Sequence, residues 1–360
     1  MDVVYGIPIL GVLFQFIGYV IEVTPGIAPI VLGLAAPIAL GALCGIMNER
    51  SGVVNIGIEG MMLSGAFTGF LVAGLVHQSM GTVEGWGPFG ITPALLAGVA
   101  AAIVVAMLLS ALHAWLSITI AADQIISGVI INVAALGLTG YLNRLLISPN
   151  PRLGAGTFST FRLPPEVADF PVVGWIVEMF LEQGPIAMSV VLFVIVLQIF
   201  LFRSRWGLRT RAVGEHPRAA DTVGINVVRL RYRNVIVAGI FAGLAGAYLT
   251  LEGTGSFQNN MTAGRGFIAL AAVIFGRWTP IGAFGAALLF AYSGAFGQAV
   301  RIRPPGDDYP DLGTIMAAIP SQVYGALPYI VTIVILAGVV GRSIAPAAVG
   351  KPYQKEEKAA

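Results

Sequence analysis

Apolar residues occur in long stretches along most of the chain, with short polar connections between them. A helix needs about 20 apolar residues to cross a hydrocarbon core about 30 Å thick, because each residue rises about 1.5 Å. About ten stretches come close to this length, so we predict an all-α, polytopic membrane protein with about ten transmembrane helices. The predicted spans cover approximately residues 3–22, 26–46, 54–76, 90–118, 122–147, 185–203, 234–252, 263–276, 279–299 and 322–341.

Two of these predicted spans are irregular. The 3–22 stretch could lie along the membrane interface instead of crossing it. The 263–276 stretch is short and is flanked by Gly264, Gly266 and Pro280, which is typical of a broken helix in a transporter. We therefore expect the helix count to be least regular at these two places.

Composition excludes a soluble globular protein. Hydrophobic residues make up 57% of the 360-residue chain and charged residues only 11%, whereas a soluble domain carries roughly a quarter charged residues. The glycines and prolines lie within apolar stretches, where membrane helices use Gly for close packing and tolerate Pro. Cys44 is the only cysteine and the three histidines are scattered, so we expect no disulfide framework, no metal site and no cofactor.

Basic residues indicate which ends of the spans face the cytoplasm, because basic connections are retained there. Placing the arginine-rich 203–233 region inside assigns fourteen of the 20 basic residues to the cytoplasm and six to the outside. Both termini are then cytoplasmic, and the clustering of charge reports topology rather than nucleic-acid binding. The cytoplasmic set is Arg50, Arg203, Arg205, Arg209, Arg211, Arg218, Arg229, Arg231, Arg233, Arg277, Arg342, Lys351, Lys355 and Lys358.

Two connections on the predicted outer side are long and acidic, at residues 148–184 and 300–321. Within the first, the apolar residues of 171–183 recur at helical spacing, which fits either an amphipathic helix on the outer surface or a plain connector. The last residues, Lys351 to Ala360, are predicted to form a solvated tail. Because we identify no separate soluble domain, residues 1–360 are predicted to form a single transmembrane domain.

The most informative polar segment is GEHPRAADTVGI, residues 214–225. Pro217 suits the first turn of a helix, an alanine pair follows, and Gly224 can end it. We predict a short helix between two spans, with flanking arginines at anionic lipid headgroups. Such a helix offers a compact knob to a soluble partner, although a solvated basic loop explains the pattern equally well.

Glu59 is a second candidate, because a carboxylate near the end of a membrane span is costly and therefore has a function by default. It could line a solute path, relay a proton, or cap backbone amides that the neighbouring glycines expose. Gln124, Asn132 and Asn143, with Asp123, lie in or at the ends of the fifth predicted span. They fit a polar path or hydrogen bonding between helices.

Several sequence signatures of enzymes are absent. No GxxxxGK[ST] motif occurs, and all the lysines lie in the tail, so the chain does not bind ATP through a Walker A loop. A GxSxG elbow and an HExxH pair are also missing. We therefore predict that this chain is not an enzyme.

Three motifs resemble permeases of bacterial ABC importers for nucleosides and simple sugars. They are ERSGVVNIGIEGMML at 49–63, GEHPRAADTVGI at 214–225 and GRGFIALAAVIFGRWTPIGA at 264–283. The resemblance spans about residues 30 to 341, and the motifs occur in the expected order. The first motif is most similar to one of two permease types that pair in nucleoside importers served by a basic-membrane-lipoprotein-type binding protein. Branched-chain amino acid and ribose permeases are more distantly similar.

The resemblance implies a permease domain within a heteromeric complex of the bacterial cytoplasmic (inner) membrane. Its other members would be a second permease subunit, an ABC ATPase subunit and an extracytoplasmic substrate-binding lipoprotein. It also implies that residues 214–225 are the coupling helix held by the ATPase. The matching positions are Glu215, Arg218, Ala219, Ala220 and Gly224. Older permeases of the superfamily place Glu directly before the alanine pair, whereas three residues intervene here.

The expected activity is movement of a small-molecule solute, a nucleoside or simple sugar, into the cell. A nucleoside path should offer aromatic faces and amide groups, and Phe257, Gln258 and Asn260 are available besides the polar residues of the fifth span. The alternative is a secondary transporter driven by an ion gradient, with Glu59 or Asp123 as proton carrier.

Overall fold

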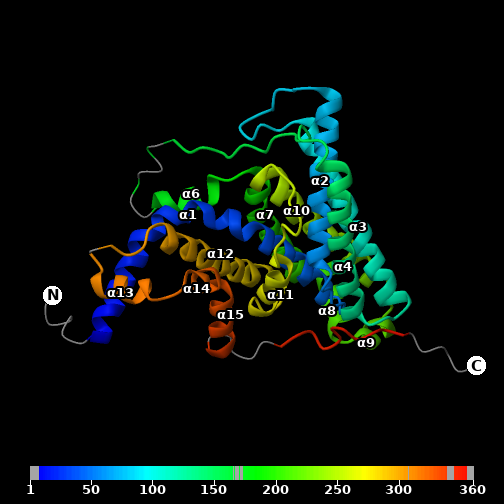
Figure 1. Ribbon diagram of the computed structural model, residues 1–360. Helices are drawn as coiled ribbons and strands as arrows, with labels where there is room; N and C mark the ends of the chain where they lie inside the picture. The colour runs from blue at the N-terminus through cyan, green and yellow to red at the C-terminus, as the bar shows by residue number, and fades with distance from the viewer. Residues whose placement is uncertain are drawn as a thin grey trace, which may run out of the picture. The chain divides into compact units, whose positions relative to one another are not determined.

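The computed structural model describes residues 8–164, 166, 170, 173–306, 308–338 and 344–354. Every regular element in this part of the chain is helical, and its only β contact is an isolated bridge between Trp86 and Ile91. The prediction of an all-α protein is therefore confirmed (Figure 1). Of the basic residues assigned to the cytoplasm, Arg342, Lys355 and Lys358 lie outside the described residues.

The helices follow one another with few interruptions. In chain order they are α1 (Pro8–Glu49), α2 (Ile58–Met80), α3 (Pro93–Ala114), η1 (Trp115–Thr119), α4 (Gln124–Leu142), η2 (Asn143–Ile147), α6 (Val173–Leu181), α7 (Pro185–Arg203), α8 (Arg205–Glu215), α9 (Pro217–Thr222), α10 (Val227–Ala247), η3 (Tyr248–Thr254), α11 (Arg265–Phe275), α12 (Pro280–Ile302), α13 (Pro310–Ala317), α14 (Ser321–Gly325) and α15 (Leu327–Gly338). The segments η1, η2 and η3 are π-helical turns that continue α3, α4 and α10.

Among the described residues, seven helices are long and apolar enough to cross a membrane. They are Gly11–Glu49, Ile58–Met80, Pro93–Thr119, Gln124–Ile147, Pro185–Arg203, Val227–Thr254 and Pro280–Ile302. The prediction of about ten spans is thus not confirmed. The predicted 263–276 span is the 11-residue helix α11, too short to cross alone, as expected for a broken helix.

The first two predicted spans form one helix. Residues 3–22 and 26–46 were separated at Pro25 and Gly26, but α1 continues through both for 42 residues. Proline keeps a backbone angle compatible with a helix and removes a single hydrogen bond, and apolar membrane helices tolerate this loss. At 1.5 Å per residue, α1 is roughly 60 Å long, about twice the hydrocarbon thickness.

The last predicted span, 322–341, is divided. Within its described part, α14 ends at Gly325 and α15 begins at Leu327, while residues 339–341 lie outside the described residues. Pro328 is the second residue of α15, and proline fits the first turn of a helix but not its interior. A helix boundary at this point therefore follows from the sequence.

The polar connection before α10 is shorter than predicted. We placed a loop at 204–233, but α10 begins at Val227, so three of the arginines lie in its first turns. Asn226 caps this helix, since its side-chain oxygen accepts a hydrogen bond from Arg229 N at 2.8 Å. A good N-cap followed by helix-favouring arginines extends the helix beyond its apolar part.

The chain divides into two compact units. Unit 1 comprises Met1–Ala35, Arg162–Gln183 and Leu288–Gly341, and unit 2 comprises Ala36–Phe161, Gly184–Ala287 and Arg342–Ala360. Helices α1 and α12 each run through both units.

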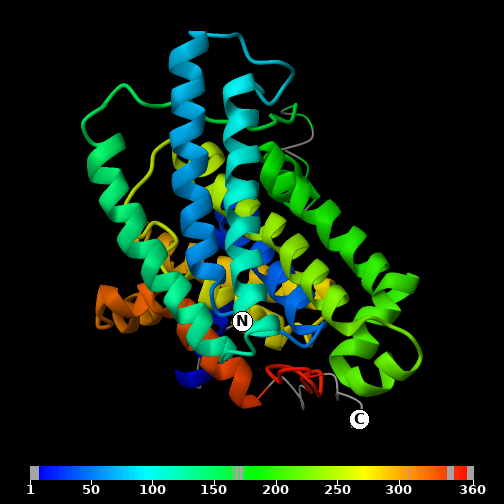
Figure 2. The ribbon, with the colours of Figure 1, turned by 90° about the vertical axis from the view of Figure 1, so that its right-hand side faces the viewer.

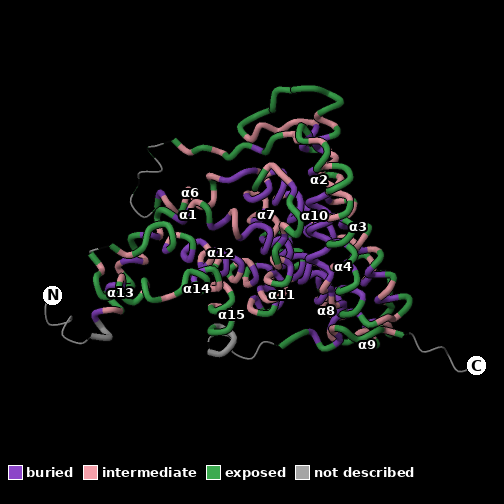
Figure 3. Tube along the Cα trace, viewed as in Figure 1, coloured by how far each residue is buried: buried purple, intermediate pink, exposed green. Residues whose placement is uncertain are grey.

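The core of unit 2 is built by α2, α3 and α10, which lie side by side (Figures 1 and 2). Glycines permit this approach: a Cβ added to Gly65 would lie 3.3 Å from Gly243 Cα, and one added to Gly246 only 2.3 Å from Met62 O. Small residues at helix contacts are a feature of membrane packing. Figure 3 shows buried positions concentrated along these helices, while the outward faces of α3 and α4 are largely exposed.

Unit 1 contains a polar network between the start of α1 and the 300–321 connection. Arg303 Nη2 lies 2.6 Å from Glu22 Oε1, and Tyr309 donates a hydrogen bond to Glu22 Oε2 at 3.1 Å. Gln15 donates to Asp311 and accepts from Leu312 N, both at 3.0 Å. Of the two alternatives for residues 171–183, an amphipathic helix or a plain connector, the structure has a helix, α6, at Val173–Leu181. Asp169 and Asp307 of the acidic connections lie outside the described residues.

Candidate functional site

The 214–225 segment is helical, as predicted. Helix α8 ends at Glu215, His216 precedes α9, and Pro217 occupies the first position of α9. The chain leaves α9 through Gly224, whose φ of 85° favours glycine. The segment therefore contains the end of α8, the short helix α9 and the turn that follows α9, and Glu215 is the last residue of α8.

One face of this segment is anchored and the other is presented to the exterior. Ala220 is buried in an apolar cluster with Val213 and Val227. Arg218 and Ala219 are exposed, and Val223, at the end of α9, is 75% exposed.

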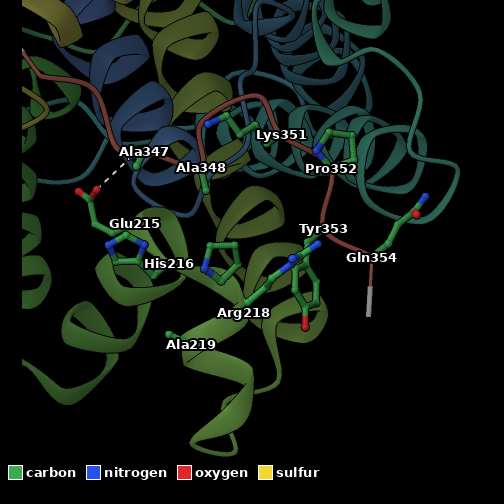
Figure 4. Close-up of a pocket in the computed structure, with 11 residues that line it drawn as sticks. Glu215, His216, Arg218, Ala219, Ala347, Ala348, Lys351, Pro352, Tyr353 and Gln354 are labelled. Carbon is green, nitrogen blue, oxygen red and sulfur yellow. Dashed lines mark hydrogen bonds between the residues drawn. The ribbon is translucent and has the colours of Figure 1, made fainter. Parts of the chain in front are cut away.

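The C-terminal segment 346–353 lies against the 214–225 segment (Figure 4). Ala348 N donates to Gly214 O at 2.9 Å, and Ala347 N donates to Glu215 Oε2 at 3.0 Å. The half-buried Tyr353 packs on the apolar cluster of Val213, Ala220 and Val227. The prediction of a solvated tail from Lys351 onward is therefore wrong for Tyr353, whereas Lys351 and Pro352 are exposed and residues 355–360 lie outside the described residues.

Arg231 connects this C-terminal segment to the end of α1. Its Nε donates to Ser51 O and its Nη1 donates to Lys351 O, each at 3.0 Å. The residue is 1% exposed. Burying a cation is costly unless its donors find partners. Two separate backbone segments accept hydrogen bonds from this guanidinium, whereas its Nη2 has no partner among the described residues.

Arg50 joins the same group of segments. Its Nε donates to Trp278 O at 2.8 Å and its Nη2 donates to Arg277 O at 3.1 Å. A Cβ on Gly214 would lie 2.3 Å from Arg50 O, so only glycine allows α8 to approach this closely. Burial lowers the pKa of the Arg50 guanidinium, and the nearby Glu215 carboxylate partly opposes the shift.

The three motifs that carry the family resemblance thus meet at one end of unit 2. The first contributes Glu49 and Arg50, the second Gly214, and the third the 277–278 turn. Trp278 Nε1 also donates a hydrogen bond to Glu49. These contacts join the 214–225 segment, the end of α1 and the α11–α12 connection.

Glu59 caps the N-terminus of α11. Its Oε1 accepts from Gly264 N at 2.7 Å and its Oε2 accepts from Gly266 N at 2.6 Å. The residue is 8% exposed. A carboxylate suits this position because the first amides of a helix lack intrahelical partners and carry partial positive charge. Of the roles considered for Glu59, the geometry corresponds to amide capping.

Gln124 and Asn132 hold the irregular backbone before α2. Gln124 Oε1 accepts from Val54 N at 2.7 Å, while Asn132 accepts from Gly60 N at 2.7 Å and donates to Ile56 O at 3.0 Å. Non-helical backbone at membrane depth requires such partners. Both residues therefore support the chain that positions Glu59, and Asp123 caps α4 through Ile125 N and Ile126 N.

The remaining path candidates lie together, around the end of η3 and the start of η2. Asn143 Nδ2 donates to Asn259 Oδ1 at 2.9 Å, and the neighbouring Gln258 and Asn260 are exposed. Phe257 is 7% exposed and packs edge-on against Phe67, with ring centroids 5.2 Å apart. Asn143, Asn259, Asn260 and Gln258 therefore lie together on an accessible surface, whereas Phe257 is part of the core.

Sequence reasoning missed a second capping carboxylate. Glu252 accepts hydrogen bonds from Ile186 N and Ala187 N, at 2.7 and 3.0 Å, at the start of α7. A Cβ on Gly184 would lie 2.4 Å from Glu252 Cδ, so glycine makes room for the carboxylate. The signal was present, because Glu252 is an acid in an apolar stretch like Glu59.

These observations define a class of protein. The chain has several helices able to span a membrane, one short helix with a capped N-terminus inside the bundle, and an anchored turn that offers exposed side chains to a partner. This is the architecture of a polytopic transport permease.

The comparisons with known proteins identify the family. The chain belongs to the branched-chain amino acid transport system / permease component family, which it matches over residues 27–336. It is 38% identical to the guanosine ABC transporter permease protein NupQ of Bacillus subtilis, over 94% of this chain and 99% of that protein. It is 33% identical to the nucleoside ABC transporter permease protein NupC of Lactococcus lactis, over 90% of this chain and 95% of NupC.

A sugar permease is also similar: the putative glucose ABC transporter permease protein TsgC13 of Haloferax volcanii is 34% identical, over 89% of this chain and 95% of that protein. No solved structure matches the chain. The predicted family and the prediction of a permease rather than an enzyme are confirmed. The chain is a multi-pass membrane protein of a transport permease family, and the relatives that it resembles are named as permease proteins of ABC transporters.

Proposed function

We propose that this chain is the permease subunit, a single transmembrane domain, of an ATP-driven importer that brings a nucleoside or simple sugar into the cell. The observation that carries the proposal is its similarity, over nine-tenths or more of its length, to two permeases named for guanosine and nucleosides. The similarity to a glucose permease supports the wider substrate class. An importer driven by an ion gradient is disfavoured, because both acids considered as proton carriers, Glu59 and Asp123, cap helices.

In this proposal the 214–225 segment lies on the cytoplasmic side and is gripped by the ATPase. Its exposed face, with Arg218, Ala219 and Val223, offers the contact surface. Closure of the ATPase on ATP moves the segment, and Arg50 carries this movement to the end of α1 and to the α11–α12 connection. The ATPase must bind one conformation of the permease more tightly than the other for the populations to shift.

The partners complete the transport path. A second permease pairs with this chain, so that the solute crosses between the two, and an extracytoplasmic lipoprotein delivers the solute. The surface with Asn143, Gln258 and Asn260 offers amide groups that can recognise hydroxyl and base edges. By contrast, Glu59, Gln124 and Asn132 act on the path by holding the backbone around α2 and α11.

Reconstitution of the complex tests the proposal. The two permeases, the ATPase and the lipoprotein are placed in proteoliposomes, and uptake of labelled guanosine, other nucleosides and glucose is measured with and without ATP. We expect ATP-dependent uptake, which falls together with stimulated ATP hydrolysis in Glu215→Ala and Arg218→Ala. Uptake by this chain alone under an ion gradient, without the ATPase, would contradict the proposal.

A further inference from the structure

The C-terminal segment 346–353 encloses a pocket together with the 214–225 segment. The pocket has a volume of about 790 Å³, and Figure 4 shows the side chains of both segments around it. Among its lining residues are Glu215, Arg218, Lys351 and Tyr353. The opening therefore adjoins the surface assigned above to the ATPase.

The C-terminal segment is held in place rather than resting loosely on the surface. Ala348 N donates a backbone hydrogen bond to Gly214 O, and the side chain of the buried Arg231 donates one to Lys351 O. Tyr353 adds an apolar anchor on the cluster beneath α9. The contacts at Ala348, Lys351 and Tyr353 hold the segment against the 214–225 segment, so that it forms one wall of the pocket.

The charges of the pocket favour an acidic partner group. Two basic residues, Arg218 and Lys351, line it against one carboxylate, Glu215, whose Oε2 already accepts a hydrogen bond from Ala347 N. Lys351 is exposed. Because complementary charges at the rim of an interface steer association and fix its register, the pocket suits an aspartate or glutamate of an approaching protein.

We infer that residues 346–353 are part of the ATPase-docking surface, and that the pocket they form with residues 214–225 receives an acidic side chain of the ATPase subunit. This inference rests on the proposed function and extends it, since it adds residues 346–353 to the ATPase contact surface of residues 214–225. Arg231 and Tyr353 act as positioning residues, because they hold the segment in place.

The test uses the assembled complex, purified through a tag on this chain, with ATPase recovery and solute-stimulated ATP hydrolysis as readouts. Lys351→Glu keeps the backbone contact with Arg231 and reverses only the side-chain charge. We expect it to lower ATPase recovery about tenfold, and Lys351→Arg to restore recovery. In the wild-type complex, recovery should fall as ionic strength rises, because rim charges are screened.

Truncated chains test the whole C-terminal segment, whereas Lys351→Glu tests only the charge of one of its side chains. A chain ended after residue 345 should lose the ATPase, whereas a chain ended after Gln354 should retain it. Should the first truncation fail to reach the membrane, Lys351→Glu decides. Normal recovery and hydrolysis in Lys351→Glu, alongside loss in Arg218→Glu, would overturn the inference and leave the proposed function standing. If Arg218→Glu also behaved as wild type, the coupling role of residues 214–225 would be refuted as well.

Discussion

Two regions of unit 2 contain polar residues of similar type: the junction where residues 54–60 meet the start of α11, and the turn region at 214–225. The two regions use these polar residues in opposite ways. At the junction, Glu59 and Asn132 direct their oxygens to backbone amides. At 214–225, the backbone groups form hydrogen bonds within α8 and α9 and with the C-terminal segment. Side chains such as Arg218 are exposed there.

This difference shows that the role of a polar residue in this protein depends on its access to water. Inside the bundle, where water is scarce, an unpaired amide costs several kcal/mol, so carboxylates and amides are needed to make irregular backbone possible. On an exposed turn the same residue types make only modest contributions to stability, and they serve contact with a partner. Variants at the two places should therefore fail by different routes.

The largest effect is expected for Glu59→Ala. It leaves the amides of Gly264 and Gly266 without their acceptor, at about 1–3 kcal/mol for each buried group. We expect a protein that is mostly lost from the membrane or unfolds at much lower temperature in detergent, as measured by fluorescence size-exclusion thermostability. A fully stable variant with selectively altered substrate affinity would instead place Glu59 in direct contact with solute.

Arg218→Glu should damage coupling without damaging the fold. The side chain is exposed, and reversal of its charge should reduce ATP-driven uptake about tenfold through a weaker grip of the ATPase. The thermal midpoint of the isolated permease should stay within a few degrees of wild type, since surface substitutions change stability by about 0.5 kcal/mol or less. A large fall in the thermal midpoint would show that Arg218, like Glu59, mainly stabilises the fold.

Glu252→Gln sharpens the comparison, because Glu252 repeats the capping device of Glu59 at the start of α7. Glutamine keeps one acceptor and sets an NH₂ group against the other amide. We expect a loss of about 1–2 kcal/mol, visible as a lower thermal midpoint, with uptake per folded molecule unchanged. If Glu252→Gln left stability intact and lowered uptake, capping would not be its main role.

Asn143→Ala should have small effects on both stability and uptake. Its single hydrogen bond to Asn259, at 2.9 Å, is exposed, and such a bond contributes roughly 0.5–1.5 kcal/mol at most. Should the amide surface near η2 recognise solute, the concentration for half-maximal uptake would rise severalfold for nucleosides. Unchanged uptake for every solute tested would remove Asn143 from the path.

Much of the fold follows from local pattern. The span 185–203 coincides with α7, since Gly184 and Pro185 mark its start and the apolar run ends at Arg203. The short helix after Pro217 and the break before α11 are equally readable. The division near Pro328 and the early start of α10 at Asn226 were available as capping signals, but apolar length outweighed them in the prediction.

The sequence by itself determined that the chain is an all-helical membrane permease, because apolar run length and motif order are properties of neighbouring residues. Tertiary structure alone decided which amides Glu59 caps, that Arg50 joins three motifs, and that Tyr353 and Lys351 belong to the 214–225 surface. These contacts join residues far apart in the chain, so their partners depend on how the helices pack, and no local pattern of residues specifies that.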